Sequence, residues 1–285
     1  MFRAFVIQFE RKDHELLKDI TLGQFFPGKS ILHRLDPRIK IIAVILYIVA
    51  IFTAKSAVSY AFLVLLVAGM VAVSGISLKT ILKSIKPLLI IIIFTAVTNV
   101  FWTKGENLLV EWKFITIYSE GIRAAILMIT RLITLITGTF VLLTYTTSPM
   151  ALTDAIERLT SPLKKLGVPT HEFAMMMTIA LRFIPTLIEE TDKIISAQKS
   201  RGADFETGSL VKRAKAIVPI LIPLFISAFR RADELASAME CRLYHGGDGR
   251  TKMKVLKLKV QDILILFFFA AVIAVTVVIN KFIYF

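Results

Sequence analysis

The sequence has a single cysteine, Cys241, so no disulfide bond can form within the chain. A reducing compartment is therefore compatible with this composition. Acidic side chains are also scarce, because 21 Asp and Glu stand against 35 Lys and Arg and leave a formal net charge of +14. The opening stretch MFRAFVIQFERKDHELL lacks the apolar core and the cleavage site of a signal peptide, so we expect no leader to be removed.

Clusters of metal-binding side chains are missing as well. His171-Glu172 lacks the second histidine of a zinc-binding helix, and the other histidines are scattered along the chain. Met175, Met176 and Met177 are consecutive, so on a helix they point about 100° apart and cannot line one face as a soft-metal path. We therefore expect no metal site and no cofactor bound by this chain.

Long apolar runs are what the sequence has in abundance. Hydrophobic residues make up 56% of the chain and its mean hydropathy is +0.72, whereas soluble domains have about 45–50% apolar residues. A membrane-crossing helix needs roughly 20 mostly apolar residues, because it must cross about 30 Å of hydrocarbon. Five stretches qualify or nearly qualify: residues 37–54, 57–75, 87–103, 123–146 and 262–280. The sequence therefore predicts an all-α integral membrane protein with about five transmembrane helices.

Charged residues lie at the start of the first of these spans and inside the fourth. The first span is short unless Arg38 and Lys40 extend their side chains to the membrane interface. Arg131 is the clearest charged residue inside a span, and a single arginine is a weak basis for a transport pathway.

Basic residues gather on one side of the predicted spans. Lys79, Lys83 and Lys86 crowd the second connection, and about half of all Lys and Arg lie in residues 149–260, whereas residues 104–120 are mixed in sign. Basic connections stay in the cytoplasm, so we expect a multi-pass cell-membrane protein with its N-terminus inside. This topology explains most of the positive charge, and we expect no nucleic-acid partner.

The predicted topology divides the chain into four parts. They are a cytoplasmic N-terminal segment (1–36), four transmembrane helices (37–147), a cytoplasmic domain (148–260) and a C-terminal transmembrane helix (261–285). The cytoplasmic domain has helical spacing of apolar residues in 173–199. Its apolar stretch 214–229 contains Pro219 and Pro223 and is short for a sixth crossing. We predict two long amphipathic helices against or beneath the membrane.

The stretch GQFFPGKS, residues 23–30, matches the G-x-x-x-x-G-K-[ST] pattern of phosphate-binding loops. Such a loop must follow a buried strand and open a helix whose amides hold phosphate. Here DHELLKDITL precedes the pattern, and Asp36-Pro37 interrupts any helix after a few residues. The context favours a turn before the first span. A nucleotide-binding membrane enzyme or pump that uses residues 23–30 stays an alternative.

One segment of the cytoplasmic domain occurs twice. ETDKIISAQKSRGAD (190–204) and RADELASAMECRLYH (231–245) align at a constant offset. The matched pairs are Asp192 with Asp233, Ile194 with Leu235, Ser196 with Ser237, Ala197 with Ala238, and Arg201 with Arg242. Each arginine is thus preceded, one helical turn back, by a small alanine on the same face.

Two interpretations of these arginines stay open at this point. A cation in the last turn favours the carbonyl end of a helix, and Gly202 is a normal left-handed stop. Alternatively, a slim helix with a guanidinium tip can enter a groove and bind carboxylates or carbonyls there. Two equivalent tips suggest two similar sockets on related or identical partners.

The chain resembles the transmembrane T component of energy-coupling factor (ECF) transporters, the vitamin and metal importers of prokaryotes. The resemblance rests on GKSILHRLDPRIK (28–40), ALRFIPTLIEE (180–190), AQKSRGAD (197–204) and the weaker AMECRLY (238–244). The motif residues are Asp36, Pro37, Arg38, Lys40, Arg182 and Pro185. The four stretches lie in order along nearly the whole chain.

In that family two coupling helices end in Ala-Arg-Gly, and each arginine docks in a groove of one ATP-binding cassette subunit. The resemblance assigns this role to Arg201 and Arg242. The first ending here is Ser200-Arg201-Gly202 and the second is Cys241-Arg242-Leu243, which lacks the glycine and leaves the end of that helix open. We expect Cys241 to replace a small family residue in packing.

The resemblance implies a non-catalytic scaffold that couples two ATPase subunits, identical or different, to a separate substrate-binding membrane S component for micronutrient uptake. ATP and Mg²⁺ would then be bound by the ATPases, and residues 148–260 would be the coupling domain. An alternative is a conventional ABC importer permease, which touches its ATPase through one short loop. Two separate arms on one chain argue against that alternative.

Overall fold

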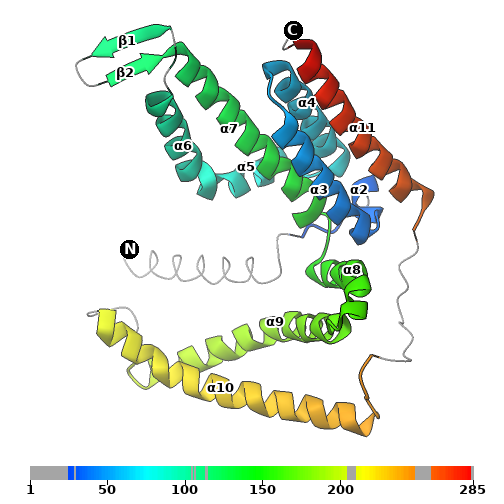
Figure 1. Cartoon of the computed structure of the whole chain (residues 1–285). Helices are drawn as coiled ribbons and strands as arrows, with labels where there is room; N and C mark the ends of the chain where they lie inside the picture. Colours follow the sequence, from blue (N-terminus) through cyan, green and yellow to red (C-terminus); the bar gives the residue numbers. More distant parts are fainter. Residues whose placement is uncertain are drawn as a thin grey trace. The chain divides into compact units, whose positions relative to one another are not determined.

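The computed structural model describes residues 25–28, 30–103, 105, 107–112, 115–203, 210–247 and 258–283. These residues form two compact units. We call residues 25–152 with 258–283 the membrane unit, and residues 153–247 the arm unit. Each unit is described by itself, and Figure 1 shows their elements.

The membrane unit is a helical bundle with one small hairpin. Its elements are α2 (Ile31–Arg34), α3 (Pro37–Thr53), α4 (Ala57–Ser74), α5 (Leu78–Ile85), a 3-10 turn (Lys86–Leu88), α6 (Leu89–Trp102), β1 (Leu108–Trp112), β2 (Ile115–Tyr118), α7 (Ser119–Thr139), a π-helical turn (Phe140–Thr144) and α11 (Val260–Ile283). Local signals explain several ends. The Asp36 side chain caps α3 with Pro37 at its first position, Ser56 caps α4, and Gly75 ends α4 in the left-handed conformation.

Five helices in the described ranges are long and apolar enough to cross a membrane: Ala57–Ser74, Leu78–Trp102, Ser119–Thr144, Thr170–Ser200 and Val260–Phe282. Four of them coincide with predicted spans, so the prediction of an α-helical membrane protein is confirmed. The predicted first span is α3, whose 17 residues extend only about 25 Å. The fifth helix of the set is α9, which we predicted to lie against or beneath the membrane.

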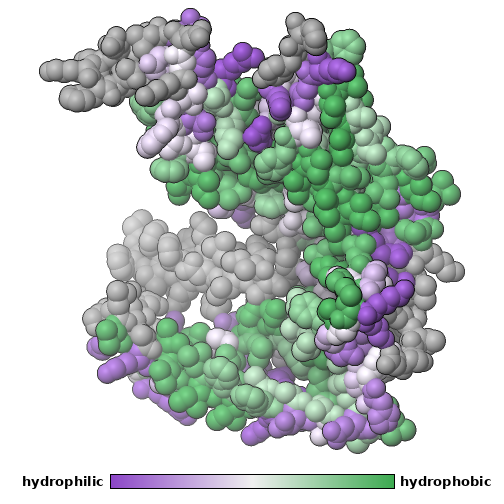
Figure 2. Space-filling view, in the orientation of Figure 1, coloured by the Kyte–Doolittle hydropathy of each residue, from purple (hydrophilic) through white to green (hydrophobic). Residues whose placement is uncertain are grey.

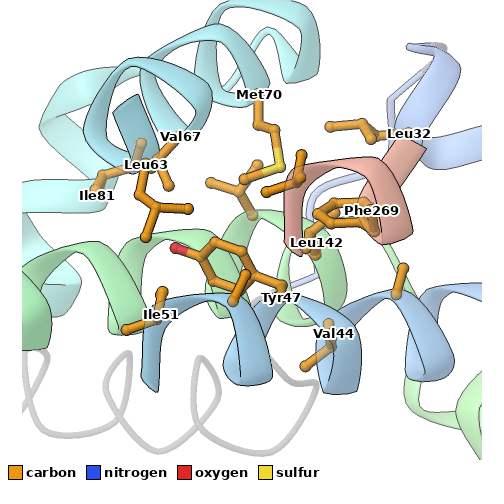
Figure 3. Close-up of a cluster of buried hydrophobic side chains, with 14 of the residues drawn as sticks. Leu32, Val44, Tyr47, Ile51, Leu63, Val67, Met70, Ile81, Leu142 and Phe269 are labelled. Carbon is orange, nitrogen blue, oxygen red and sulfur yellow. The ribbon is translucent and has the colours of Figure 1, made fainter. Parts of the chain in front are cut away.

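The core of the membrane unit surrounds Tyr47 on α3. Tyr47 is fully buried, its hydroxyl donates to the Thr134 carbonyl oxygen on α7 at 2.5 Å, and its ring contacts Phe269 of α11 edge-on. Gly138 makes room for the ring, because a Cβ there would overlap it. Figure 3 shows Leu142 and Phe269 close to Tyr47 in this cluster. α3, α7 and α11 are therefore held together by one buried aromatic side chain.

One end of the bundle is closed by polar side chains. The Arg131 guanidinium donates to the Tyr60 hydroxyl at 2.6 Å and to the Ala54 carbonyl oxygen at 3.4 Å. Asn280 of α11 accepts from the Ser56 backbone at 3.4 Å and donates to the Thr53 carbonyl oxygen at 2.6 Å. Arg131 and Asn280 together thus satisfy backbone groups at the turn between α3 and α4.

One small hairpin accompanies the helices of the predicted all-α fold. β1 and β2 pair antiparallel within the connection 104–120, which the sequence analysis had treated only as a loop of mixed charge. The β-branched run ITIY is the local signal for such a strand. The hairpin is too small to change the fold class.

The arm unit consists mainly of two long helices. Its elements are α8 (Pro149–Thr160), which starts in the membrane unit, a 3-10 stretch (Ser161–Leu166), α9 (Thr170–Ser200) and α10 (Leu210–Cys241). α9 and α10 pack on each other and run in opposite directions, so their C-terminal ends lie on opposite sides of the unit (Figure 1). Pro185 in α9, and Pro219 and Pro223 in α10, lie inside the helices without ending them.

Candidate docking site at the two helix tips

The C-terminal end of α9 closes in a Schellman motif. The Gly202 amide donates to the Lys199 carbonyl at 3.0 Å, and the Ala203 amide donates to the Gln198 carbonyl at 3.0 Å. Gly202 takes the required left-handed conformation, with φ of +86°. Arg201 is therefore the C-cap residue, the last residue before the chain turns away.

The C-terminal end of α10 closes in the same motif without a glycine. The Leu243 amide donates to the Glu240 carbonyl at 2.9 Å, and the Tyr244 amide donates to the Met239 carbonyl at 3.1 Å. Leu243 has φ of +54° and is the only non-glycine with positive φ in the described part of the chain. Arg242 therefore occupies the same C-cap position as Arg201. The missing glycine does not shift the end of the helix.

Both arginines are exposed and available to a partner. Neither guanidinium has a hydrogen bond or an ion pair to any residue that the structure describes. Ala197 and Ala238, one turn back, are exposed as well and keep each helix slim below its tip. An exposed arginine at the carbonyl end of a helix is compatible with both interpretations, a favourable helix end and a docking group.

The other residues predicted at the tips are also on the surface. The Ser200 hydroxyl donates to the Ser196 carbonyl oxygen at 3.0 Å, which satisfies it within its own helix. Cys241 is exposed, so its thiol does not fill a packing gap in this chain, contrary to our expectation. It is the only cysteine and lies next to Arg242.

The two arm helices are tied by an ion pair that the sequence analysis missed. Arg231 of α10 donates to the Glu190 carboxylate of α9 at 2.7 Å. No local signal could identify this pair, because its members are far apart in sequence. Of the two predicted motif residues nearby, Arg182 is exposed and Pro185 is half-buried in α9.

The arm helices carry a large exposed apolar surface. Large apolar side chains are exposed along both: Phe173, Met176 and Met177 on α9, and Ile217, Val218, Leu221, Ile222, Phe225, Ile226 and Phe229 on α10. Figure 2 shows apolar residues gathered over these helices. Contiguous apolar surface of this kind marks contact with a membrane or with another protein.

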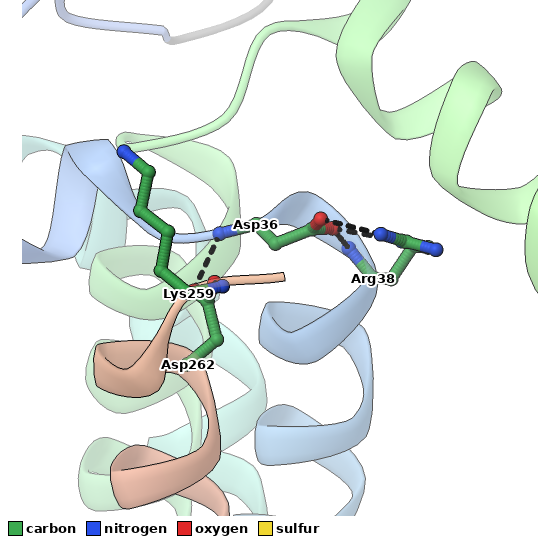
Figure 4. Close-up of polar contacts among 4 residues, drawn as sticks. All are labelled: Asp36, Arg38, Lys259 and Asp262. Atoms are coloured by element: carbon green, nitrogen blue, oxygen red, sulfur yellow. Dashed lines mark hydrogen bonds and ion pairs between the residues drawn. The ribbon is translucent and has the colours of Figure 1, made fainter. Parts of the chain in front are cut away.

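The LDPR-x-K motif ties the first helix of the bundle to its last helix. The Asp36 carboxylate accepts from the Arg38 guanidinium at 2.8 and 3.1 Å, and the Asp36 amide donates to Asp262 at 2.9 Å (Figure 4). Asp262 also accepts from the Lys259 amide at 2.8 Å and is 1% exposed. Asp262 was not among the predicted residues, since its partners lie at the other end of the chain.

Lys40 corrects another expectation. Its side chain does not extend to the interface but is 2% exposed inside the bundle. Its ammonium donates to the Thr146 carbonyl oxygen at 2.8 Å and to the Thr147 hydroxyl at 3.1 Å. Lys40 therefore satisfies backbone and hydroxyl groups just after the π-helical turn, where helix carbonyls lack partners.

The phosphate-loop alternative gains no support from its neighbourhood. Lys29 and residues 23–24 lie outside the described residues, but the helix that follows, α2, has only four residues. The Ser30 hydroxyl is hydrogen-bonded to the His33 ring at 2.7 Å. Among the residues that the structure describes, no group of three or more His, Cys, Asp or Glu could hold a metal ion.

Comparison with known proteins gives consistent matches over most of the chain. The family model described as "Cobalt transport protein" (CbiQ) matches residues 28–253. Three similar proteins carry the name "Energy-coupling factor transporter transmembrane protein EcfT". That of Clostridium kluyveri is 52% identical over 248 residues, covering 87% of this chain and 92% of the relative. That of Thermosediminibacter oceani is 50% identical over 268 residues (94% and 100%), and that of Bacillus subtilis is 42% identical over 241 residues (85% and 91%).

Proposed function

Because the chain belongs to the CbiQ family, together with the EcfT transmembrane proteins of energy-coupling factor transporters, we propose that it couples two ATPase subunits to a substrate-binding membrane subunit. The observation that carries this proposal is the pair of helix caps with the same hydrogen-bond pattern, each with an exposed arginine that has no partner in the described residues. The chain itself catalyses no reaction.

Each tip docks in a groove of one ATPase subunit. A guanidinium offers five donors in a fixed geometry and binds carboxylates or carbonyls in pairs. The exposed alanines below the tips, Ala197 and Ala238, let the helix end enter a narrow groove. The tips lie on opposite sides of the arm unit, which suits one groove on each of two subunits (Figure 1).

The arms transmit motion because they are long and continuous. α9 has 31 residues and α10 has 32, so each extends about 45 Å. ATP binds to the partner subunits and closes them, and their grooves then move the docked tips. Such coupling is reciprocal, so the position of the arms also changes the affinity of the ATPases for nucleotide.

The apolar surface of the arms is where the chain contacts the bilayer interface and the substrate-binding subunit. This subunit selects the vitamin or metal ion, and its reorientation delivers the cargo. The tips and Lys79, Lys83 and Lys86 face the cytoplasm, as does the N-terminus. ATP and Mg²⁺ are bound by the ATPases, and this chain holds no cofactor of its own.

Reversing the charge of both tips tests the proposal. In Arg201→Glu with Arg242→Glu, the ATPase pair recovered with the tagged chain falls at least about 30-fold, since losing an interface anchor costs about 2 kcal/mol or more. The matched control is Lys193→Glu with Arg230→Glu, which makes the same charge change at exposed positions of the same helices. Unchanged recovery in the tip variant contradicts docking. Intact-complex mass spectrometry adds a second criterion, because two copies of the chain per ATPase pair indicate a conventional permease.

A further inference from the structure

The membrane unit contains an apolar cavity that the coupling role does not use. The cavity lies between α4, α5 and α7 and has a volume of about 730 Å³. Its walls include Val64, Ala68 and Ala72 of α4, and Leu78 and Ile81 of α5, and no charged side chain lines it. The volume lies in the range of about 300–1,000 Å³ that small-molecule sites usually have.

The cavity opens onto the outer surface of the bundle. Three of its large apolar wall residues are exposed: Val64 by 43%, Leu78 by 70% and Ile133 of α7 by 37%. Exposed apolar side chains on a membrane-spanning bundle face hydrocarbon. An occupant that enters from the bilayer must therefore be apolar where it lies in the cavity.

A row of lysines lies on α5, which lines one wall of the cavity, and on the 3-10 turn that follows it. Lys79, Lys83 and Lys86 are spaced i, i+4 and i+7, so they share one face, and all three are exposed. None of them has a hydrogen bond or ion pair with the residues described by the structure. The opposite face of α5 is buried through Ile81 and Ile85. Apolar burial on one face and lysines on another are typical of a helix at a membrane interface.

We propose that this site binds an anionic phospholipid, with one acyl chain in the cavity and the phosphate beside Lys79 and Lys83. Leu78 and Ile81 line the cavity, and Lys79 and Lys83 lie on another face of the same short helix, so the acyl chain and the phosphate lie on two faces of α5. A phospholipid has both an apolar acyl chain for the cavity and an anionic phosphate for the lysines. Basic sites beside transmembrane helices are known to hold anionic head groups in this way. The proposal is independent of the docking role of the arms.

Lipid retention tests the site on the full chain purified in mild detergent. Phosphatidylglycerol and phosphatidylcholine with the same acyl chains are added, and bound lipid is counted by native mass spectrometry. We expect a preference of about 25-fold for phosphatidylglycerol, since each lysine near a membrane surface contributes about fivefold. Lys79→Gln with Lys83→Gln should remove this preference. Equal retention of the two lipids by the native chain, or an unchanged preference in the lysine variant, overturns the head-group assignment.

Filling the cavity tests the acyl-chain assignment separately. Ala72→Phe places a ring in the cavity and should reduce retention of both lipids, whereas Val73→Phe, on the same helix but outside the wall, should leave retention unchanged. Ala68→Phe fills the cavity from another position and replaces Ala72→Phe if that variant does not fold. Unchanged retention in a folded cavity-filling variant shows that the chain binds lipid elsewhere, and overturns the assignment.

Discussion

Leu243 adopts a backbone conformation that glycine adopts at the other tip. Its φ of +54° places it in the left-handed region, which costs a residue with a Cβ about 1–2 kcal/mol. Its side chain is 77% exposed and gains little from packing in return. The cap hydrogen bonds of Leu243 and Tyr244 hold the turn in place and keep Arg242 at the end of α10. Strain of this kind is often found where a site must keep a fixed geometry.

Exchanging the residue types at the two caps should therefore change the stability of the arm unit in opposite directions. Leu243→Gly relieves the strain and should stabilise the arm unit by up to about 1 kcal/mol, and Gly202→Ala should destabilise it by about 1 kcal/mol. Thermal melting of the full chain in detergent measures both. A lower melting temperature for Leu243→Gly than for the native chain would show that Leu243 makes a contact that outweighs its strain.

Lys40 gives a second prediction for a single side chain. Lys40→Met keeps the apolar stem but leaves the Thr146 carbonyl oxygen and the Thr147 hydroxyl without their buried donor, at a cost of about 1–3 kcal/mol. We expect a lower melting temperature in detergent. Lys55→Met, at an exposed position, is the control and should melt like the native chain. Equal melting of both variants contradicts a structural role for the buried ammonium.

The sequence identifies individual functional or structural residues, but it does not show which residues they contact in the fold. The repeated frame predicts that Arg201 and Arg242 end helices, because helix caps are local features. The LDPR-x-K motif identifies Lys40, yet its burial depends on Thr146, far along the chain. Asp262 carries no local signal at all, since its role appears only when α11 packs beside α3.

Among the helices, the crossing of α9 and α10 determines how far apart the two tips lie. Arg231 and Glu190 form its ion pair at 2.7 Å, and both side chains are partly exposed. An exposed ion pair contributes little to overall stability. Its location between two long helices nevertheless lets it limit the angle at which they cross, and with it the separation of the tips.

A charge exchange tests this role. Spin labels on native Cys241 and on Ser200→Cys report the distance between the tips. Glu190→Arg alone, or Arg231→Glu alone, should broaden the distance distribution, and the double exchange should restore it. Glu189→Arg, at the exposed neighbouring position, is the control. If the distance distribution of the double exchange is as broad as that of the single variants, the ion pair does not limit the crossing angle of α9 and α10.

Apolar length and period predicted most helices, because lipid requires a helix to satisfy its own backbone hydrogen bonds. The same reasoning did not separate spans from other helices for two elements, α3 and α9. α3 is short because Asp36-Pro37 starts it and Ala54 ends it, and it is buried against α7 and α11 rather than surrounded by lipid. α9 is apolar enough to be grouped with the spans, although its charged residues give it an amphipathic surface.

For the molecule as a whole, the two units have different surfaces and suit different environments. The membrane unit buries its polar groups in capping contacts and exposes apolar side chains, as a bundle in lipid must. The arm unit combines an apolar surface with exposed charged tips. The proposed coupling role requires this combination, since one unit would stay in the bilayer while an ATPase moves the other.

The labelling of Cys241 is the most direct test of the central claim that the tips are cytoplasmic docking points. Cys241 is exposed, adjacent to Arg242 and the only cysteine, so a membrane-impermeant maleimide reports on this tip alone. We predict labelling in inverted vesicles but not in right-side-out vesicles, and protection when the ATPase pair is bound. Labelling in right-side-out vesicles, or unchanged labelling of the assembled complex, would contradict the claim.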